Sequence, residues 1–469
     1  MILVYDKKYY WRSLCIIGIA TAIMYASGGA GFVLLVPFIF SALFTNKAES
    51  LFFWLLLTVA MVVGNSVIIP KGIVFAMSQR AALVILGFCM ATQIFGGRKS
   101  TLITPFLWIL PYLLFMACAS LQGWSPIVSY LKLFLYTSIY FAYLGVAKRV
   151  SESNLIVAKK IRSVVLAFSA FFIFGSILLI PFPGISQLSG EAYLLNPNMT
   201  SLFMGMTMHS QSLGPTIAAL STLLFADLLF SVKKLDKLYV AMLLCCPILI
   251  FKTSSRTGMA TYLVGMGYVA WLFMRARIAN QRWKTKMVNI IWGLFVILIL
   301  MFIGTSGGRE GVKKYILKGS SDTEISLETV NSRQGLIDSQ LDNFMKKPFF
   351  GNGFQVNEET ALVNRTSIKD YLTAPVEKGV WVTAALEEGG VIGFILFVSF
   401  VFGAIIALTS RKAFIAASCL VVAIVSNLGE FTFFSMSYTG GIVWAVVFAG
   451  LVLDIQRSRQ ERVGFHVYG

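Results

Sequence analysis

Long apolar runs without charge recur along almost the whole chain and constrain its fold more than any other feature. Two examples are LFFWLLLTVAMVVGNSVI at 51–68 and MVNIIWGLFVILILMFI at 287–303. Runs of this length and apolarity are typical of transmembrane helices. The chain is also only 13% charged, whereas soluble domains average about 25%. The sequence therefore predicts an all-α, polytopic integral membrane protein.

The apolar runs predict about 12 to 14 transmembrane helices. The range arises because the first two runs are short and separated by SGGAG, so they form either one kinked helix or a hairpin. The predicted spans are 13–26, 29–44, 51–68, 80–96, 102–119, 125–147, 163–181, 206–231, 238–251, 257–274, 287–303, 389–409, 413–428 and 436–454.

Basic residues concentrate in alternate loops between these spans, which predicts the orientation of the chain. The strongly basic segments 148–162, 233–237, 275–286 and 457–462 all fall on the side of the N-terminus. Because Lys and Arg are enriched in cytoplasmic loops, this side, with both termini, is predicted to be cytoplasmic. Much of the net charge of +18 is then a topology signal, and we expect no nucleic-acid partner.

One long hydrophilic segment, 304–388, falls on the opposite side as a large extracytoplasmic loop. Loops of this length are usually functional. Within it, VNSRQGLIDSQLDNFM has apolar residues at helical spacing, and KPFFGNGF then ends that helix. The chain thus divides into a first transmembrane bundle (1–303), the loop (304–388) and C-terminal transmembrane helices with a basic tail (389–469).

Motifs for nucleotide-driven or metal-driven chemistry are missing from the sequence. It has no Walker motif, no HExxH and no Cys or His cluster with metal-ligand spacing. All six cysteines lie inside apolar runs, as small buried hydrophobic residues do. We therefore expect no metal site and no cofactor.

Few cations are predicted on the outer side. Outside the large loop they are Lys71, Arg80, Lys252 and Arg256. Arg256 begins a predicted helix in KTSSRTGMATYLVGM, where Ser254 or Ser255 is placed to cap that helix. Free backbone N–H groups and an arginine at a helix N-terminus form an anion site. The alternative is that Arg256 only contacts lipid headgroups.

Two further polar residues are candidates within the apolar part of the chain. Lys132 would lie about 10 Å below the outer surface if its segment is helical, and a lysine at that depth is a functional candidate. Its alternatives are pairing with a structural carboxylate such as Asp227, or reaching the interface. His209, in GMTMHSQSLGP, either binds substrate or packs as an ordinary helix residue.

Several carboxylates are also predicted on the outer side, and we expect most of them to be solvated and one to serve as a general base. They are Glu358, Glu359, Asp370, Glu377, Glu387, Glu388 and Glu430. Glu387 and Glu388 stand directly before GGVIGF, where the chain is expected to re-enter the membrane.

Taken in order, these features resemble the O-antigen ligase and polymerase superfamily. The similarity rests on the late outer loop, on SSRTG at a helix start, and on the stretches SRQGLIDSQLDNFMKKPFFGNGF and ALEEGGVIGF. HSQSLG at 209–214 is similar to an earlier family motif at an outer helix start. The residues that match the family pattern are Arg333, Pro348, Gly351, Gly353, Glu388, Gly390 and Gly393.

The resemblance implies metal-independent glycosyl transfer of the GT-C type at the periplasmic face of the bacterial inner membrane. The implied partners are a glycan donor on undecaprenyl diphosphate, a glycan or lipid acceptor, the lipid bilayer and other polysaccharide-assembly proteins. Arg256 and Arg333 would stabilise the departing diphosphate in place of a metal. The residues that we expect to bind substrate are Arg80, Lys132, His209, Lys252 and Lys347.

One departure from the family pattern bears on the reaction. Ligases of this family usually carry a histidine shortly before Glu-x-Gly-x-x-Gly, but APVEKGVWVTAALEEGG has none, and Glu377 is the nearest substitute as a base. This favours a polymerase of O-antigen or exopolysaccharide repeat units over a ligase that joins the glycan to lipid A-core. A transporter or flippase of lipid-linked glycans is the alternative from another class, but it predicts related halves that the sequence does not display.

Overall fold

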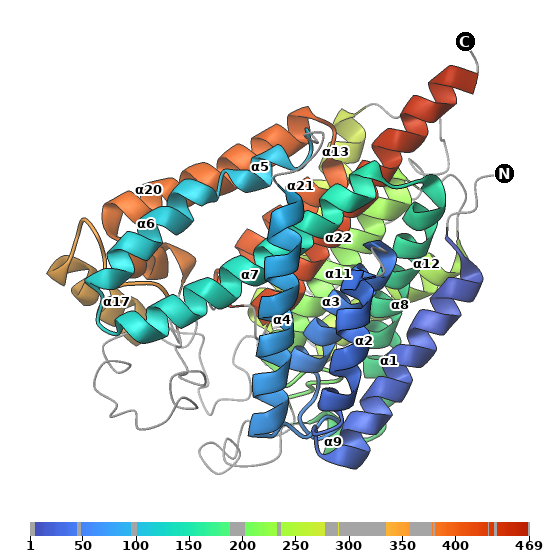
Figure 1. Cartoon of the computed structure of the whole chain (residues 1–469), viewed down its shortest axis with the longest axis horizontal. Helices are drawn as coiled ribbons and strands as arrows, with labels where there is room; N and C mark the ends of the chain where they lie inside the picture. The colour runs from blue at the N-terminus through green and yellow to red at the C-terminus, as the bar shows by residue number, and fades with distance from the viewer. Residues whose placement is uncertain are drawn as a thin grey trace, which may run out of the picture.

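The computed structural model shows a bundle of α-helices (Figure 1). The residues that it describes are 5–44, 48–94, 101–187, 202–231, 236–276, 289, 334–356, 378, 380–429, 431–435 and 439–467. The helices of the N-terminal part are α1 (Lys7–Ser27), α2 (Phe32–Phe44), α3 (Ala48–Val63), α4 (Ile73–Ile94), α5 (Thr104–Leu107), α6 (Leu110–Leu121), α7 (Pro126–Glu152), α8 (Leu155–Leu179) and α9 (Pro183–Ser186). They are followed by α11 (Ser210–Phe230), α12 (Lys237–Lys252), α13 (Arg256–Arg275), α17 (Gln334–Lys346), α20 (Trp381–Ser410), α21 (Phe414–Ser426) and α22 (Thr439–Val467).

Many of these helices have the length and composition of membrane spans. Seven described segments are long and apolar enough to cross a bilayer: Thr104–Leu121, Pro126–Glu152, Ile156–Leu179, Ser210–Phe230, Arg256–Arg275, Trp381–Ser410 and Thr439–Glu461. Shorter apolar helices lie at Phe32–Ser41, Ala48–Val63, Ile73–Ile85 and Phe414–Ser426. The predicted all-α, polytopic class is therefore confirmed. The predicted span at 287–303 lies outside the described residues except for residue 289.

The first two apolar runs form two helices, not one kinked helix. Gly28 ends α1 in the left-handed conformation, with φ of 61°, and its backbone N–H donates to the carbonyl of Met24. This conformation is the one that glycine adopts without steric cost. The next glycine, Gly29, approaches the backbone of Pro70 so closely that a Cβ there would clash. The SGGAG segment is therefore a tight turn between two helices.

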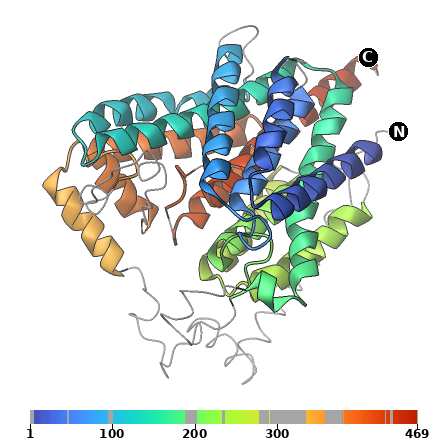
Figure 2. The same cartoon turned by 60° about the horizontal axis from the view of Figure 1, so that its bottom comes forward.

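Basic segments that are far apart in the sequence meet at one end of the bundle. Arg459 donates to the carbonyl of Val150 at 3.1 Å, and Gln456 donates to the carbonyl of Ala158 at 2.6 Å. The end of α22 and the connection between α7 and α8 therefore lie side by side. The start of α1 and the end of α22 both lie on the right in Figures 1 and 2, opposite α17. That this end is cytoplasmic stays a prediction.

A buried ion pair lies at this basic end. Nη2 of Arg162 on α8 contacts Oδ1 of Asp227 on α11 at 2.9 Å, and the hydroxyl of Tyr239 on α12 donates to Oδ2 of Asp227 at 2.5 Å. All three side chains are buried. The alternative partner considered for Lys132, Asp227, thus binds an arginine and a tyrosine from other helices.

The opposite end is closed partly by short backbone pairings between loops. Asn65, directly after α3, donates its backbone N–H to the carbonyl of Met206 at 2.9 Å, and Met208 donates to the carbonyl of Val63 at 3.0 Å. His209 then caps the N-terminus of α11, because its Nδ1 accepts from the backbone N–H of Gln211 at 3.0 Å. The loop after α3 and the start of α11 are therefore fixed to each other.

Candidate functional site

A break in α20 organises the end of the bundle where α17 lies. Gly390 has φ of 60° and ψ of −166°, which is not helical, although α20 continues on both sides of it. This φ/ψ combination is essentially restricted to glycine. A break leaves backbone carbonyls and N–H groups without partners within the helix, and such groups are costly in an apolar environment.

The turn after α17 supplies partners for the groups that the break frees. Asn352 donates its backbone N–H to the carbonyl of Glu387 at 2.9 Å, and Gly353 donates to the carbonyl of Glu388 at 3.0 Å. In return, Val391 donates its N–H to the carbonyl of Pro348 at 2.8 Å. We call this set of three backbone bonds between 348–353 and 387–391 the interlock.

Glycines allow the two backbones of the interlock to approach each other. A Cβ on Gly351 would collide with the carbonyl of Glu388, and a Cβ on Gly390 would collide with the carbonyl of Phe349. Both glycines also have positive φ, of 69° and 60°. The two glycine motifs that the sequence analysis singled out separately are thus two sides of one contact.

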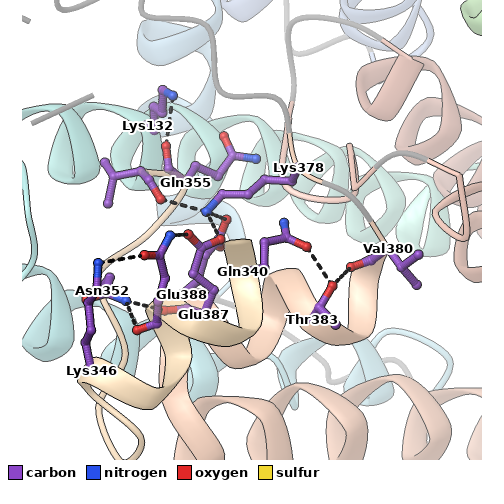
Figure 3. Close-up of polar contacts among 12 residues, drawn as sticks. Lys132, Gln340, Lys346, Asn352, Gln355, Lys378, Val380, Thr383, Glu387 and Glu388 are labelled. Atoms are coloured by element: carbon purple, nitrogen blue, oxygen red, sulfur yellow. Dashed lines mark hydrogen bonds and ion pairs between the residues drawn. The ribbon is translucent and has the colours of Figure 1, made fainter. Parts of the chain in front are cut away.

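The outer ends of α6 and α7 hold the residues that follow the turn. The hydroxyl of Ser129 donates to the carbonyl of Phe354 at 3.0 Å, and Nζ of Lys132 donates to the carbonyl of Gln355 at 2.9 Å. The Phe354 ring enters the core, where its centroid lies 5.3 Å from that of Phe434. Figure 3 shows Lys132 reaching the backbone of Gln355. Lys132 therefore positions the loop.

Two carboxylates and a lysine are buried beside the interlock. Glu387 and Glu388 are 1% and 0% exposed, so the expectation that the outer carboxylates are mostly solvated is wrong for this pair. Nζ of Lys378 bonds to Oε2 of Glu387 and lies 4.0 Å from Oε1 of Glu388. Figure 3 shows Lys378 beside these two carboxylates. Asn343 of α17 donates to Oε1 of Glu387 at 3.0 Å. These polar contacts therefore link α17, α20 and the segment that precedes α20.

Two lysines, Lys378 and Lys132, lie near the two carboxylates of this cluster. Buried ionic groups need such partners because an unpaired buried charge costs several kcal/mol. The cluster is thus suited to fixing the loop, whereas binding of an anionic substrate requires cations outside it.

Arg256 is the first residue of α13 and lies at a well-defined helix N-terminus. The hydroxyl of Ser255 accepts from the N–H of Gly258 at 3.1 Å, so Ser255 is the capping residue among the two serines considered. The start of α13 touches α11 closely, since a Cβ on Gly214 would lie 2.6 Å from the Cβ of Ser255. Arg256 is partly exposed.

A short connection after α21 joins this helix start to the buried charges. Phe431 donates its N–H to the carbonyl of Lys378 at 3.3 Å, and Trp381 donates to the carbonyl of Asn427 at 3.2 Å. In the same connection, a Cβ on Gly429 would collide with Thr257, the neighbour of Arg256. Arg256 and the buried charges therefore lie at the same end of the bundle, with residues 427–431 between them.

The other predicted substrate residues are distributed around this end. Lys347 donates to the carbonyl of Gln122 at 2.5 Å, so it joins the turn after α17 to the connection between α6 and α7. Lys252 is exposed at the end of α12, Arg80 is partly buried on α4, and His209 caps α11. The predicted catalytic residues Arg333 and Glu377 lie outside the described residues.

Sequence reasoning missed several residues that the structure brings together here. Lys378, Asn343 and Asn352 all bond to Glu387. Lys378 stands only nine residues before Glu387, but no local pattern indicates that the two pair. Gln340 of α17 accepts from the Thr383 hydroxyl at 2.6 Å, which adds a second polar link between α17 and α20. The only sequence signal for these contacts is the set of polar residues on one side of α17.

Fold and site together define a polytopic, all-helical membrane protein with its polar site at one end of the bundle. Residues 240–398 match the family model described as O-antigen ligase. The match runs from α12 to beyond the break in α20, and it confirms the resemblance to the O-antigen ligase superfamily. The match and the apolar helices support a multi-pass bacterial membrane enzyme of the O-antigen ligase or polymerase type. A comparison with curated proteins finds no match.

Proposed function

We propose that this protein polymerises glycan repeat units carried on undecaprenyl diphosphate, at the periplasmic face of the inner membrane. A hydroxyl of one glycan attacks the anomeric carbon of a lipid-linked glycan and forms a new glycosidic C–O bond. The bond from that carbon to the diphosphate breaks, and undecaprenyl diphosphate leaves with the electron pair. The hydroxyl proton passes to a carboxylate of the protein.

The observation that carries the proposal is the place of Arg256 at a capped helix N-terminus beside the 427–431 connection. The leaving diphosphate gains negative charge in the transition state, and a guanidinium with helix N–H groups is suited to stabilise it. Arg333 directly precedes α17 in the chain, and α17 is anchored to Glu387 through Asn343. We propose that Arg256 and Arg333 bind the same diphosphate.

Glu377 is the proposed general base. Its neighbour Lys378 is held on two sides, since its Nζ donates to the carbonyl of Val356 at 2.7 Å and also bonds to Glu387. Glu377 directly precedes this fixed point in the chain. Glu387 and Glu388 are less suitable as bases, because both are buried and engaged with Lys378.

Polymerisation is favoured over ligation because no histidine precedes the Glu388 motif. In the segment before Glu388, Lys378 makes polar contacts, and its ammonium is bonded to the carboxylate of Glu387. An ammonium in such a pair is a poor proton acceptor, whereas a histidine near neutral pH is a good one. The acceptor base therefore differs from that expected of a ligase.

The test is a reconstituted reaction with the purified protein in liposomes and a synthetic undecaprenyl-diphosphate-linked repeat unit as the sole substrate. We expect a ladder of products that grow by one repeat unit at a time. Transfer of a single glycan to added lipid A-core, without a ladder, would make the protein a ligase. Movement of the lipid-linked glycan across the bilayer without a new glycosidic bond would make it a flippase.

A further inference from the structure

The helix α17 faces the rest of the protein with polar side chains. Gln340 and Asn343 are each only 4% exposed and bond to Thr383 and Glu387. In a soluble domain, a surface helix normally buries its apolar side and exposes its polar side. Leu336, Ile337 and Phe344 are partly buried on the same side, whereas Leu341 and Met345 face away from it.

Two apolar residues of α17, Leu341 and Met345, lie on an exposed flank. Leu341 and Met345 are 39% and 70% exposed, and the turn that follows exposes Phe349 and Phe350 by 65% and 54%. Large apolar side chains gathered in this way usually mark a contact with a membrane or another protein.

The other flank of α17 is charged and exposed. It carries Asp342 and Lys346, with Ser339 beside them, whereas Asp338 lies close to the direction of Met345, two turns nearer the N-terminus. At about 100° per residue, Ser339 lies roughly 120° around the helix from Met345. One side of α17 thus meets α20, one flank is apolar and one flank is polar, which is the pattern of a helix that lies in a membrane interface.

The apolar flank continues into the outward surface of two membrane-spanning helices. The ring of Phe350 stacks on that of Phe115 of α6, with centroids 6.2 Å apart. On α6 itself, Leu114 is 67% exposed, and on α20 Ile395 is 56% exposed. Outward apolar side chains on spans of this kind contact lipid. Figures 1 and 2 show α17 at the edge of the bundle beside α6 and α20.

From this continuity we infer that α17 is an interfacial helix that rests in the outer surface of the bilayer. Leu341, Met345, Phe349 and Phe350 enter the acyl-chain region, and Asp342 and Lys346 face water. The occupant of the apolar flank is the bilayer itself, because the flank merges with the lipid-facing surface of α6 and α20.

This placement deepens the proposed function but does not depend on it. An interfacial α17 brings its N-terminus to the depth of lipid headgroups, and Arg333 directly precedes that N-terminus in the chain. The diphosphate of a lipid-linked donor lies at that depth, since its polyprenyl chain is in hydrocarbon and its charges are not. The loop would thus meet its substrate in the membrane plane.

The test is site-directed spin labelling of the full chain in nanodiscs, without substrate, after its six cysteines are replaced by serine. One label is placed at Met345→Cys and the matched control at Ser339→Cys, and collisions with dissolved oxygen and with a water-soluble nickel chelate are measured. We expect the Met345 label to collide several-fold more with oxygen than with nickel relative to Ser339. The measurement involves no reaction, so its result is independent of the polymerase assay.

Three outcomes would overturn the inference. Equal nickel accessibility at both positions would place the apolar flank in water. An immobile Met345 label shielded from both reagents would show that protein, such as a second copy of the chain, covers the flank. Protection that appears only after undecaprenyl diphosphate is added would assign the flank to the substrate's polyprenyl chain.

Discussion

Asn352 donates its backbone N–H to the carbonyl oxygen of Glu387 at 2.9 Å, across 35 residues of sequence. This bond joins the turn after α17 to the helix that re-enters the bundle. The same Glu387 holds Asn343 and Lys378 through its side chain. Glu387 therefore connects the turn after α17, α17 itself and the segment that precedes α20. The effects of substitutions around Glu387 on stability should be coupled.

Substitution of the interlock glycines should destabilise the protein. Gly351→Ala and Gly390→Ala each place a Cβ against backbone and force a positive φ on alanine, at a cost of about 1–3 kcal/mol. The control is Gly335→Ala in α17, where a Cβ meets nothing within 4 Å. Thermal unfolding in detergent should show lower midpoints for the first two variants only. A Gly390→Ala protein as stable as the Gly335→Ala control would contradict the interlock.

Substitution of Lys378 should lower the free energy of unfolding more than substitution of Glu387. Lys378→Met leaves Glu387 and Glu388 buried as like charges, whereas Glu387→Gln leaves Lys378 with Glu388 at 4.0 Å. Breaking a buried pair from one side typically costs about 3–5 kcal/mol, and replacing both partners costs less. A double-mutant cycle of unfolding free energies should therefore give strong coupling. Additive effects would argue against the pair.

Replacement of Arg256 should reduce turnover without reducing the amount of protein. Arg256→Lys keeps the charge but loses the two-pronged grip on phosphate oxygens, so it should already be damaging. Arg256→Ala should lose about 2.7–4 kcal/mol of transition-state stabilisation, or roughly 100- to 1,000-fold in turnover. We expect the same of Arg333→Lys and Arg333→Ala.

The matched control for Arg256 is Arg275→Ala, because Arg275 is exposed at the opposite end of the same helix. Polymer length and membrane abundance are measured together for all variants. An Arg256 that only contacts headgroups would tolerate lysine, and its loss would change abundance instead of chemistry. Near-normal polymer from both alanine variants at normal abundance would refute the proposed anion site.

Lys71 should react with acylating reagents at lower pH than ordinary lysines. Burial in the loop after α3 lowers the pKa of its ammonium from 10.5 to about 7, and its Nζ is 2.5 Å from the carbonyl of Val62. The rate of acetylation, followed by mass spectrometry, should therefore be half-maximal near pH 7, compared with about 10.4 for a model lysine. A rate that rises only near pH 10 would contradict this.

The same pKa shift makes stability depend on pH. Because the pKa is lower in the folded state, the unfolded chain binds more protons between pH 7 and 10.5, and stability should rise with pH across that window. Lys71→Met should remove this slope.

Chelation should leave the reaction intact. Within the part of the chain that the structure describes, no group of three or more His, Cys, Asp or Glu side chains is placed to hold a metal ion. The proposed mechanism assigns the diphosphate charge to arginines instead. Polymer formation in the liposome assay should therefore be unchanged by EDTA. Loss of activity that magnesium restores would refute an arginine-only mechanism.

The fold could be predicted from local patterns, because hydrocarbon thickness sets a length that each apolar run meets on its own. The cap at Ser255 could also be predicted from the sequence, since capping depends on residues within one turn. The burial of Glu387 and Glu388 could not be predicted, because their partners Asn343 and Lys378 come from other segments. The interlock was hidden for a further reason: its bonds join backbone groups, and only the glycines that permit the approach appear in the sequence.

The order of the segments has a consequence for how the protein is made. Synthesis proceeds from the N-terminus, so the turn at 348–353 exists before the helix whose break it fills. If α20 entered the bilayer alone, the carbonyls of Glu387 and Glu388 and the N–H of Val391 would face hydrocarbon, which lipid cannot satisfy. With the turn already synthesised, these groups find partners as soon as the helix emerges from the insertion machinery. Because of this chain order, the nascent protein avoids an intermediate with unpaired backbone groups in the membrane.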